Sequence, residues 1–429
     1  MKISKNLKFY YAFIATALCL STTQLHSMNI IEEISYPRPR VILGCSGGGL
    51  RGYVSARILE ELEKAVGSPE NPVHIHQIIS GSIGDSTGAI ISAEMALDPS
   101  AFKDNTSRSE TESVPQRVAK LYVQKGPSIF SSQQPCALLD WLQKTSFGSF
   151  FTSIKNVFYP KYDGINLRKI LEEEVKDLSL LDTRFAPQGK NYMTSSRIIP
   201  KRIELALLTC DMRTGTTYEF NSEKIRRGEQ PNFLLKDALY AASAQATTFP
   251  TAHIHPIGPD KKYNMSQALD LIGEGPLDNP IFPALQMGLR QLKERGIDPM
   301  KELLNHYHEY KNGSRPPLLR IVHIGTGHHT TRMLPPEQFH QGGILKIMPN
   351  LLTTLLENQN ANASQTVQLF AEYLPFVSFY NLEGETSISS LVDDQPTPEA
   401  FKELERVAIS VTQTPDFINL SKSLKKDMQ

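Results

Sequence analysis

The sequence contains few cysteines, no excess of charge of either sign and no long apolar run. Its four cysteines are too far apart to form a C-x-x-C pair: Cys19, Cys45, Cys136 and Cys210. This spacing indicates neither a zinc site nor a dense disulfide framework. Cys45 and Cys210 end apolar segments, and we expect them to be buried thiols. The 45 Lys and Arg residues balance 45 Asp and Glu residues, so charge does not favour nucleic acid as a partner.

An apolar segment near the start of the chain is too short for a comfortable membrane span. It covers Tyr10–Leu20 and follows three lysines in the first eight residues. Such a pattern is typical of a secretory signal peptide. We therefore predict a signal peptide over residues 1–27 and a secreted or periplasmic, membrane-associated protein. An uncleaved membrane anchor is the alternative interpretation.

Strand-like and helix-like segments alternate along the rest of the chain. The apolar pattern predicts strands over residues 41–44, 74–80, 203–210, 216–221, 268–272 and 318–324. It predicts helices over residues 51–66, 86–97, 114–125, 135–145, 165–176, 237–246, 280–295, 363–373 and 398–411. Alternation of this kind favours an α/β fold with a largely parallel central sheet. Residues 331–429 are expected to form a mainly helical C-terminal extension that covers the sheet.

A glycine-rich loop, Cys45–Gly52, lies between the first predicted strand and the first predicted helix. It contains Gly47, Gly48 and Gly49 in succession. Backbone N–H groups at the start of a helix can hold an oxyanion or a phosphate, so this loop is expected to supply donors rather than core packing. No lysine follows as in a P-loop, which makes nucleotide binding the weaker interpretation.

The segment Gly84–Gly88 has the G-x-S-x-G spacing of a nucleophile elbow, with Ser86 at its centre. Small residues flank such a serine because it lies in a tight strand-to-helix turn. The preceding strand is predicted to end at Ser80, which implies three inserted residues before the elbow. Ser82, within that insertion, is an alternative hydroxyl without the same glycine spacing.

The two motifs in this order resemble the patatin-like phospholipase family, in its secreted bacterial form. The resemblance covers residues 40–330 and includes three further landmarks: Tyr162–Leu167, an Ala- and Ser-rich helix followed by Phe249-Pro250, and the segment Gly325-Thr326-Gly327. It implies a patatin-like three-layer α/β fold. It also implies a phospholipase A or esterase that cleaves carboxylic esters of membrane lipids. Such an enzyme would use no metal or cofactor and would act on phospholipid or another lipid ester at a membrane surface.

The resemblance also implies roles for particular residues. Ser86 corresponds to the nucleophile, and Gly47, Gly48 and Gly49 with Arg51 correspond to the oxyanion loop. The family's proton acceptor is an aspartate in a D-G-G turn. Here the matching stretch is Ile272–Pro280, and its alignment on Asp278-Asn279-Pro280 places Ile272 at the aspartate position. The D-G-G motif is therefore degenerate in this chain.

Two carboxylates, Asp270 and Glu274, lie two residues to either side of Ile272. Alternate side chains of a strand share a face, so either could point towards the serine. Because active sites of open α/β sheets lie beyond the carboxyl ends of the strands, Glu274 is the preferred base. Asp270 is expected one pleat deeper and is the alternative.

A serine without a base is a poor nucleophile, which leaves other interpretations open. One is a catalytically degenerate secreted binding protein on a patatin scaffold. Another is a Ser-His-Asp hydrolase that recruits a histidine such as His323 or His253, although the sequence fixes neither near Ser86. His328 and His329 have no spaced acidic partner, so they do not indicate a metal site.

Overall fold

The computed structural model describes residues 38–98, 112–130, 160–184, 202–245, 248–273, 279–329, 361–386 and 396–428. The expected signal peptide, the predicted helix over residues 135–145 and Glu274 lie outside these residues. The following description concerns the compact unit that begins at Pro37.

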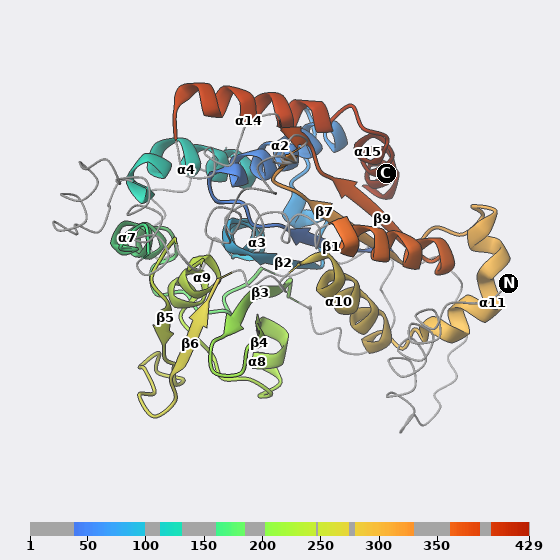
Figure 1. Ribbon diagram of the computed structural model, residues 1–429. Coiled ribbons are helices and arrows are strands. Elements are labelled where there is room, and N and C mark those ends of the chain that lie inside the picture. Colours follow the sequence, from blue (N-terminus) through green and yellow to red (C-terminus); the bar gives the residue numbers. More distant parts are fainter. Residues whose placement is uncertain are drawn as a thin grey trace, which may run out of the picture. The chain divides into compact units, whose positions relative to one another are not determined.

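The centre of this unit is a sheet with the strand order β5-β6-β3-β2-β1-β7-β9, with β4 paired to β3 (Figure 1). Its strands are β1 (Arg40–Cys45), β2 (Gly81–Asp85), β3 (Glu204–Asp211), β4 (Thr216–Asn221), β5 (Ala252–Ile254), β6 (Leu269–Ile272), β7 (Leu319–Ile324) and β9 (Val377–Leu382). Strands β3, β2, β1, β7 and β9 are parallel, whereas β4, β5 and β6 join through antiparallel pairs. The prediction of a largely parallel sheet is confirmed.

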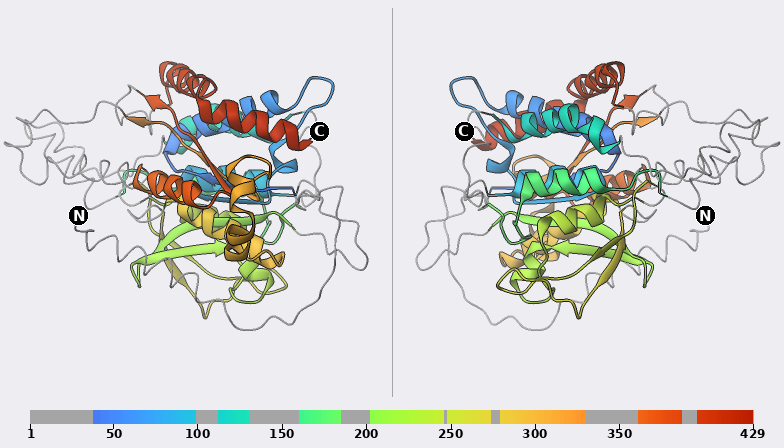
Figure 2. Two further views of the ribbon diagram at one scale, coloured as in Figure 1. Left: turned by 90° about the vertical axis from the view of Figure 1, so that its right-hand side faces the viewer. Right: turned by 90° about the vertical axis from the view of Figure 1, so that its left-hand side faces the viewer.

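Helices cover both faces of the sheet, as the side views in Figure 2 show. Apolar side chains of one face pack against α2 (Gly52–Val66), α3 (Ser86–Ala96), α4 (Val114–Ile129), α7 (Ile165–Val175), α9 (Leu235–Ser243), α14 (Pro398–Val411) and α15 (Pro415–Met428). The other face packs against α10 (Ile281–Glu294), α11 (Pro299–Lys311) and a helix over residues 361–373. Strand β1 is buried throughout because helices lie on both sides of it. The predicted three-layer α/β fold is therefore confirmed.

The second predicted strand is wrong in its position. Residues predicted as strand over 74–80 contain the short 3-10 helix η2 (Ile75–Gln77), and β2 is Gly81–Asp85. The small residues of β2 gave no apolar signal, yet the whole strand is buried. A Cβ atom at Gly81 would lie 2.5 Å from the Met287 sulfur of α10, so close helix packing requires a small residue there. Consequently Ser86 follows its strand directly, and the expected three-residue insertion does not exist.

The C-terminal residues contribute a strand as well as helices. The predicted helices over 363–373 and 398–411 are present, and α15 follows them. Strand β9 pairs with β7 in parallel from Leu319↔Val377 to Ile324↔Leu382. This strand was not predicted. The division of the chain at residue 330 into a domain and an extension stays a prediction.

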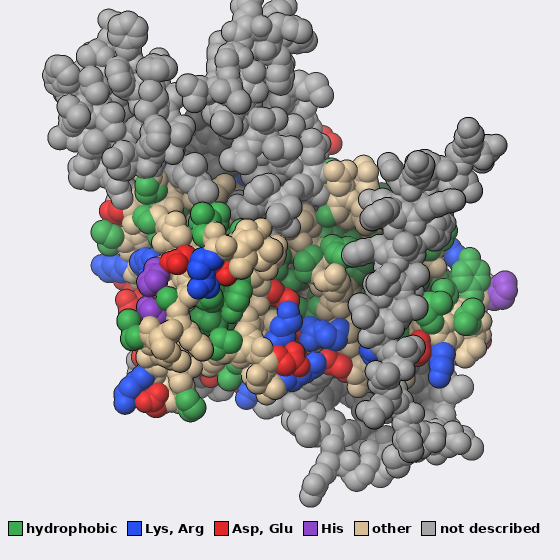
Figure 3. All heavy atoms as spheres, turned by 60° about the horizontal axis from the view of Figure 1, so that its bottom comes forward, with side chains coloured by type: hydrophobic (Ala, Val, Ile, Leu, Met, Phe, Trp, Pro, Cys, Tyr) green, Lys and Arg blue, Asp and Glu red, His purple; other side chains and the backbone are tan. Residues whose placement is uncertain are grey.

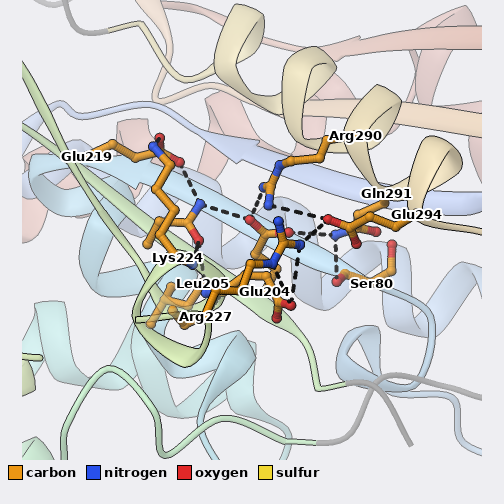
Figure 4. A network of polar contacts seen from close by, with 12 residues as sticks. Ser80, Glu204, Leu205, Glu219, Lys224, Arg227, Arg290, Gln291 and Glu294 are labelled. Carbon is orange, nitrogen blue, oxygen red and sulfur yellow. Dashed lines mark hydrogen bonds and ion pairs between the residues drawn. The ribbon is translucent and has the colours of Figure 1, made fainter. Parts of the chain in front are cut away.

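A buried polar network closes the amino-terminal edge of the central strands (Figure 4). Glu204, the first residue of β3, pairs with Arg290 and accepts from Gln291 Nε2 at 3.1 Å and from Asn221 Nδ2 at 2.8 Å. Arg227 pairs with Glu294 of the same helix, α10. On the face turned forward in Figure 3, Lys and Arg side chains likewise lie among Asp and Glu side chains. The bonds of Glu204 fasten α10 to the sheet at the edge opposite to Ser86, and the Arg227 pair joins α10 to the end of α8 (Ser222–Arg226).

Helix α14 is fastened to α2 by one carboxylate. Glu405 accepts from Nε and Nη2 of Arg57, each at 2.8 Å, and from the Tyr53 hydroxyl at 2.9 Å. The bond from Arg57 lowers the pKa of Glu405, and burial raises the pKa of Tyr53 to about 12. The two hydrogen bonds between Arg57 and Glu405 join residues 348 positions apart in the sequence.

Glu405→Gln should lower the free energy of unfolding at pH 7 by roughly 0.5–1 kcal/mol, since the pair is partly exposed. A carboxylate with a lowered folded pKa stabilises the protein above its unfolded pKa, and this contribution is lost as the pH falls through the folded value. Denaturant unfolding of both proteins should therefore give stabilities that converge as the pH falls below the unfolded pKa of glutamate and through the lower folded pKa of Glu405. A difference that stays constant with pH would contradict the assigned role of the charge.

Candidate active site

Ser86 lies at a sharp turn between β2 and α3 and has a left-handed backbone, with φ of 48°. Positive φ is uncommon outside glycine and costs free energy, and it is a feature of nucleophile elbows. The flanking glycines are required by space. A Cβ atom at Gly84 would lie 2.2 Å from the Gly88 carbonyl oxygen, and one at Gly88 would lie 2.0 Å from that of Cys45. The predicted elbow is thus present in the backbone geometry.

The glycine loop lies beside this turn because β1 and β2 are parallel neighbours with Cys45 opposite Gly84. The Gly47 N–H donates to Asp85 Oδ2 at 3.1 Å. Within the described residues, the N–H groups of Gly48 and Gly49 donate to no acceptor. These two donors are therefore available for an oxyanion, whereas Gly47 instead fixes the loop to the residue before Ser86.

The loop is fastened to the segment that follows β7, Gly325–Gly327. Thr326 Oγ1 donates to the Gly47 carbonyl oxygen at 3.0 Å, and Arg51 Nη1 donates to that of Gly327 at 2.5 Å. Arg51 therefore holds the loop in place. A Cβ atom at Gly48 would lie 2.4 Å from Thr326 Oγ1, so there is little space for a side chain at this position of the loop.

The small-residue helix α9 lies directly behind the elbow. The Ser243 hydroxyl donates to the Ser86 carbonyl oxygen at 3.5 Å, a long bond. The Gly273 N–H donates to the Ala244 carbonyl oxygen at 2.9 Å, and a Cβ atom at Gly273 would lie 2.3 Å from that of Ala242. The end of β6 and the elbow thus contact the same end of α9.

The two candidate bases differ in their surroundings. Asp270 is half exposed and lies 2.7 Å from His253 Nδ1 of β5, the strand next to β6 at the end of the sheet. Glu274 lies outside the described residues. The expectation that Asp270 lies one pleat deeper is wrong, because β6 runs antiparallel to β3. Strand β6 begins near Asp270, at the carboxyl end of β3, and runs back along β3 towards the level of Leu208. Leu208 is the register partner of Asp85.

Other groups considered from the sequence do not meet Ser86. Ser82 lies within β2 and is fully buried, and His253 pairs with Asp270 at the far edge of the sheet. His323 Nε2 lies 2.8 Å from Ser46 Oγ instead. Among the described residues, no carboxylate or imidazole lies within hydrogen-bonding distance of Ser86 Oγ.

The thiols and histidines provide no further chemistry at this site. Burial raises the pKa of the Cys45 thiol to about 12, so it is inert as expected. Cys210 is only partly buried, which corrects the prediction for it. His328 and His329 form β8 (His328–His329), which pairs with β10 (Glu385–Thr386). The described part of the chain holds no group of three residues able to bind a metal, and it contains no helix long and apolar enough to cross a membrane.

Two contacts, one of the glycine loop and one of the elbow, were not predicted from the sequence. Asp85 bonds the glycine loop, and the Tyr122 hydroxyl of α4 contacts the Thr87 hydroxyl beside the elbow. Tyr122 is buried, which raises the pKa of its hydroxyl. The signal for Asp85 was its place next to Ser86 in the motif, but Tyr122 had no comparable signal because 35 residues separate it from Thr87.

Comparison with known proteins supports a relationship to the patatin-like family. The chain is 26% identical over 210 residues to Patatin-like protein 2 of Oryza sativa subsp. indica, which covers 49% of this chain and 43% of that protein. It is 24% identical over 239 residues to Patatin group A-2 of Solanum tuberosum, which covers 55% of this chain and 49% of that protein. The chain thus spans about half the length of the curated relatives it matches.

The comparison of structures is much weaker. VipD from Legionella pneumophila has 10% sequence identity and a TM-score of 0.33, with 90% of this chain and 67% of that chain covered. No family model matches the chain.

Proposed function

We propose that this protein is a patatin-like lipid acyl hydrolase of the secreted bacterial type, a phospholipase A or esterase with Ser86 as nucleophile. The observation that carries the proposal is the left-handed backbone of Ser86 at the turn from β2 to α3, beside a loop with two available N–H donors. The sequence similarity to patatins supports a hydrolase of this family. The substrate class is a phospholipid or another lipid ester at a membrane surface.

The chemistry follows from these positions. Ser86 Oγ attacks the ester carbonyl carbon, and a carboxylate accepts its proton. The N–H groups of Gly48 and Gly49 stabilise the oxyanion of the tetrahedral intermediate. Its collapse breaks the ester C–O bond, and the protonated acid returns the proton to the departing alcohol. Water then hydrolyses the acyl-enzyme by the same steps and restores Ser86.

We propose Glu274 as the carboxylate. It follows Gly273, whose N–H bonds the Ala244 carbonyl oxygen, and the neighbouring Ser243 contacts the backbone of Ser86. The direction of β6 also carries the chain towards the level of the elbow after Ile272. Asp270 is the weaker candidate because it is half exposed and paired with His253.

Covalent labelling tests the nucleophile directly. A fluorophosphonate probe should label the wild type and should not label Ser86→Ala, because only an activated serine is phosphonylated rapidly. Ser266→Ala is the matched control, since Ser266 is exposed and bonded only within its own turn. Equal labelling of the Ser86 and Ser266 variants would exclude Ser86 as the nucleophile.

Two acid-to-amide variants test the base. Glu274→Gln should lower the turnover of a soluble ester by roughly 10²–10⁴, the usual worth of a positioned general base. Asp270→Asn should leave turnover within about twofold, and Ile272→Asp should raise it by restoring the family residue. A large loss in Asp270→Asn with none in Glu274→Gln would exchange the two roles.

A catalytically degenerate binding protein is the alternative function. It is favoured by Ile272 at the position of the family aspartate, and no carboxylate among the described residues is hydrogen-bonded to Ser86 Oγ. It predicts a wild type that is neither labelled nor active on esters.

We also propose export, with removal of residues 1–27. The pattern of lysines followed by Tyr10–Leu20 supports it. N-terminal sequencing of the protein recovered outside the cytoplasm should begin near Met28. Recovery with Met1 intact, in the cytosol alone, would rule it out.

A further inference from the structure

A chain of polar side chains lies next to the glycine loop, at the carboxyl ends of β1, β7 and β9; Ser46 and His323 are buried, and Asn381 and Glu383 are partly buried. His323 is fully buried, and its Nε2 lies 2.8 Å from Ser46 Oγ, while its Nδ1 lies 2.6 Å from Asn381 Oδ1. Glu383 Oε2 is 3.8 Å from the same Nδ1. The mechanism proposed above uses none of these four residues.

This chain interrupts an apolar surface. Ile42, Ile321 and Phe379 precede Ser46, His323 and Asn381 on the same face of their strands, where they belong to the core beside α10. Buried polar groups destabilise a fold unless they are hydrogen-bonded, and here both ring nitrogens of His323 have a hydrogen-bond partner.

The hydrogen-bond partners define the orientation of the imidazole. Nδ1 faces two acceptor oxygens, those of Asn381 and Glu383, and is therefore assigned as the donor on that side of the ring. Nε2 shares a hydrogen bond with the Ser46 hydroxyl. This hydrogen bond fixes the side chain of Ser46, the residue immediately before Gly47.

Glu383 links this chain to the other attachment of the loop. Its Oε1 accepts from the Gly327 N–H at 3.0 Å, and Gly327 in turn accepts from Arg51 at the far end of the loop. A Cβ atom at Gly325 would lie 2.3 Å from the Glu383 carboxyl carbon, so this carboxylate is packed closely against the segment. Residues at both ends of the glycine loop are therefore connected through hydrogen bonds to the same polar cluster.

We propose that His323 is a positioning residue for the glycine loop. It holds Ser46, and with Asn381 and Glu383 it keeps the Gly48 and Gly49 N–H groups directed at the oxyanion formed over Ser86. His323 itself contacts no substrate. The proposal rests on the proposed function of Ser86, and it assigns to the C-terminal residues of the chain a part in the oxyanion site.

Two isosteric variants separate positioning from packing. Glutamine places an amide near the position of Nε2 and can bond Ser46, whereas asparagine places one near Nδ1 and cannot. In the full chain, His323→Asn should lower kcat for p-nitrophenyl butyrate by roughly 10–10², with KM within about twofold, since the donors move while the binding surface does not. His323→Gln should retain at least ten times the kcat of His323→Asn.

The pair Ser46 and His323 should also behave as one unit. Ser46→Ala should lose about as much kcat as His323→Asn, and the double variant should lose no more than the larger single loss. Additive losses would overturn the proposal, as would equal losses in the Gln and Asn variants, because packing alone would then explain them.

Amide hydrogen exchange gives a readout that does not need activity. The peptide over residues 45–52 should exchange at least about tenfold faster in His323→Asn than in the wild type, but not in His323→Gln. If the wild type is unlabelled by fluorophosphonate yet this difference appears, the proposed reaction fails and the loop-holding role stands. Unchanged exchange in both variants would overturn the role of His323 whether or not the protein is an enzyme.

Discussion

The candidate site depends on a close approach of backbone to backbone at the crossing of β1, β2 and α3. Gly88, in the first turn of α3, lies so near the Cys45 carbonyl that a single methyl group would fall 2.0 Å from its oxygen. Gly84 contacts Gly88 in the same way across the elbow. This contact lies at the turn where Ser86 has its left-handed backbone, and it places the glycine loop beside that turn. Any side chain at either glycine would separate the serine from the loop.

The two edges of the central strands use polar groups in different ways. At the amino-terminal edge, Glu204 is fully compensated by Arg290, Gln291 and Asn221, so this network stabilises the attachment of α10. At the carboxyl-terminal edge, polar groups hold loops in position and leave the N–H groups of Gly48 and Gly49 without an acceptor among the described residues. The polar residues that attach α10 and those that hold the loops of the candidate site therefore lie at opposite ends of the parallel strands.

The C-terminal residues belong to this arrangement although they follow the elbow by almost three hundred positions. Asn381 and Glu383 reach the cluster next to the glycine loop because β9 extends the parallel sheet beside β7. Glu405 of α14 bonds to Arg57 of α2, the helix that directly follows the glycine loop. This contact attaches the outer helical layer to α2. A chain ending after β7 would lack these contacts.

Local sequence was sufficient for features that depend on local geometry. The spacing of glycines around Ser86 follows from the steric demands of one turn, and the alternation of apolar segments follows from the layers of an α/β fold. The predictions for Ser86, for the glycine loop at a helix start and for the parallel sheet rest on such patterns. The buried state of Cys45 was likewise evident from the apolar strand that it ends.

Only the tertiary structure decided the features that depend on distant partners. The position of β2 was mispredicted because its burial comes from close helices, not from its own side chains. Because β6 runs antiparallel to β3, Ile272 lies nearer than Asp270 to the level of the elbow, the opposite of the expected order. Nothing within the sequence of β6 encodes its pairing with β3. The bond between Ser46 and His323 joins residues 277 positions apart, so only strand order could bring them together. Pairing between distant strands is set by the packing of the whole domain, which short patterns in the sequence do not contain.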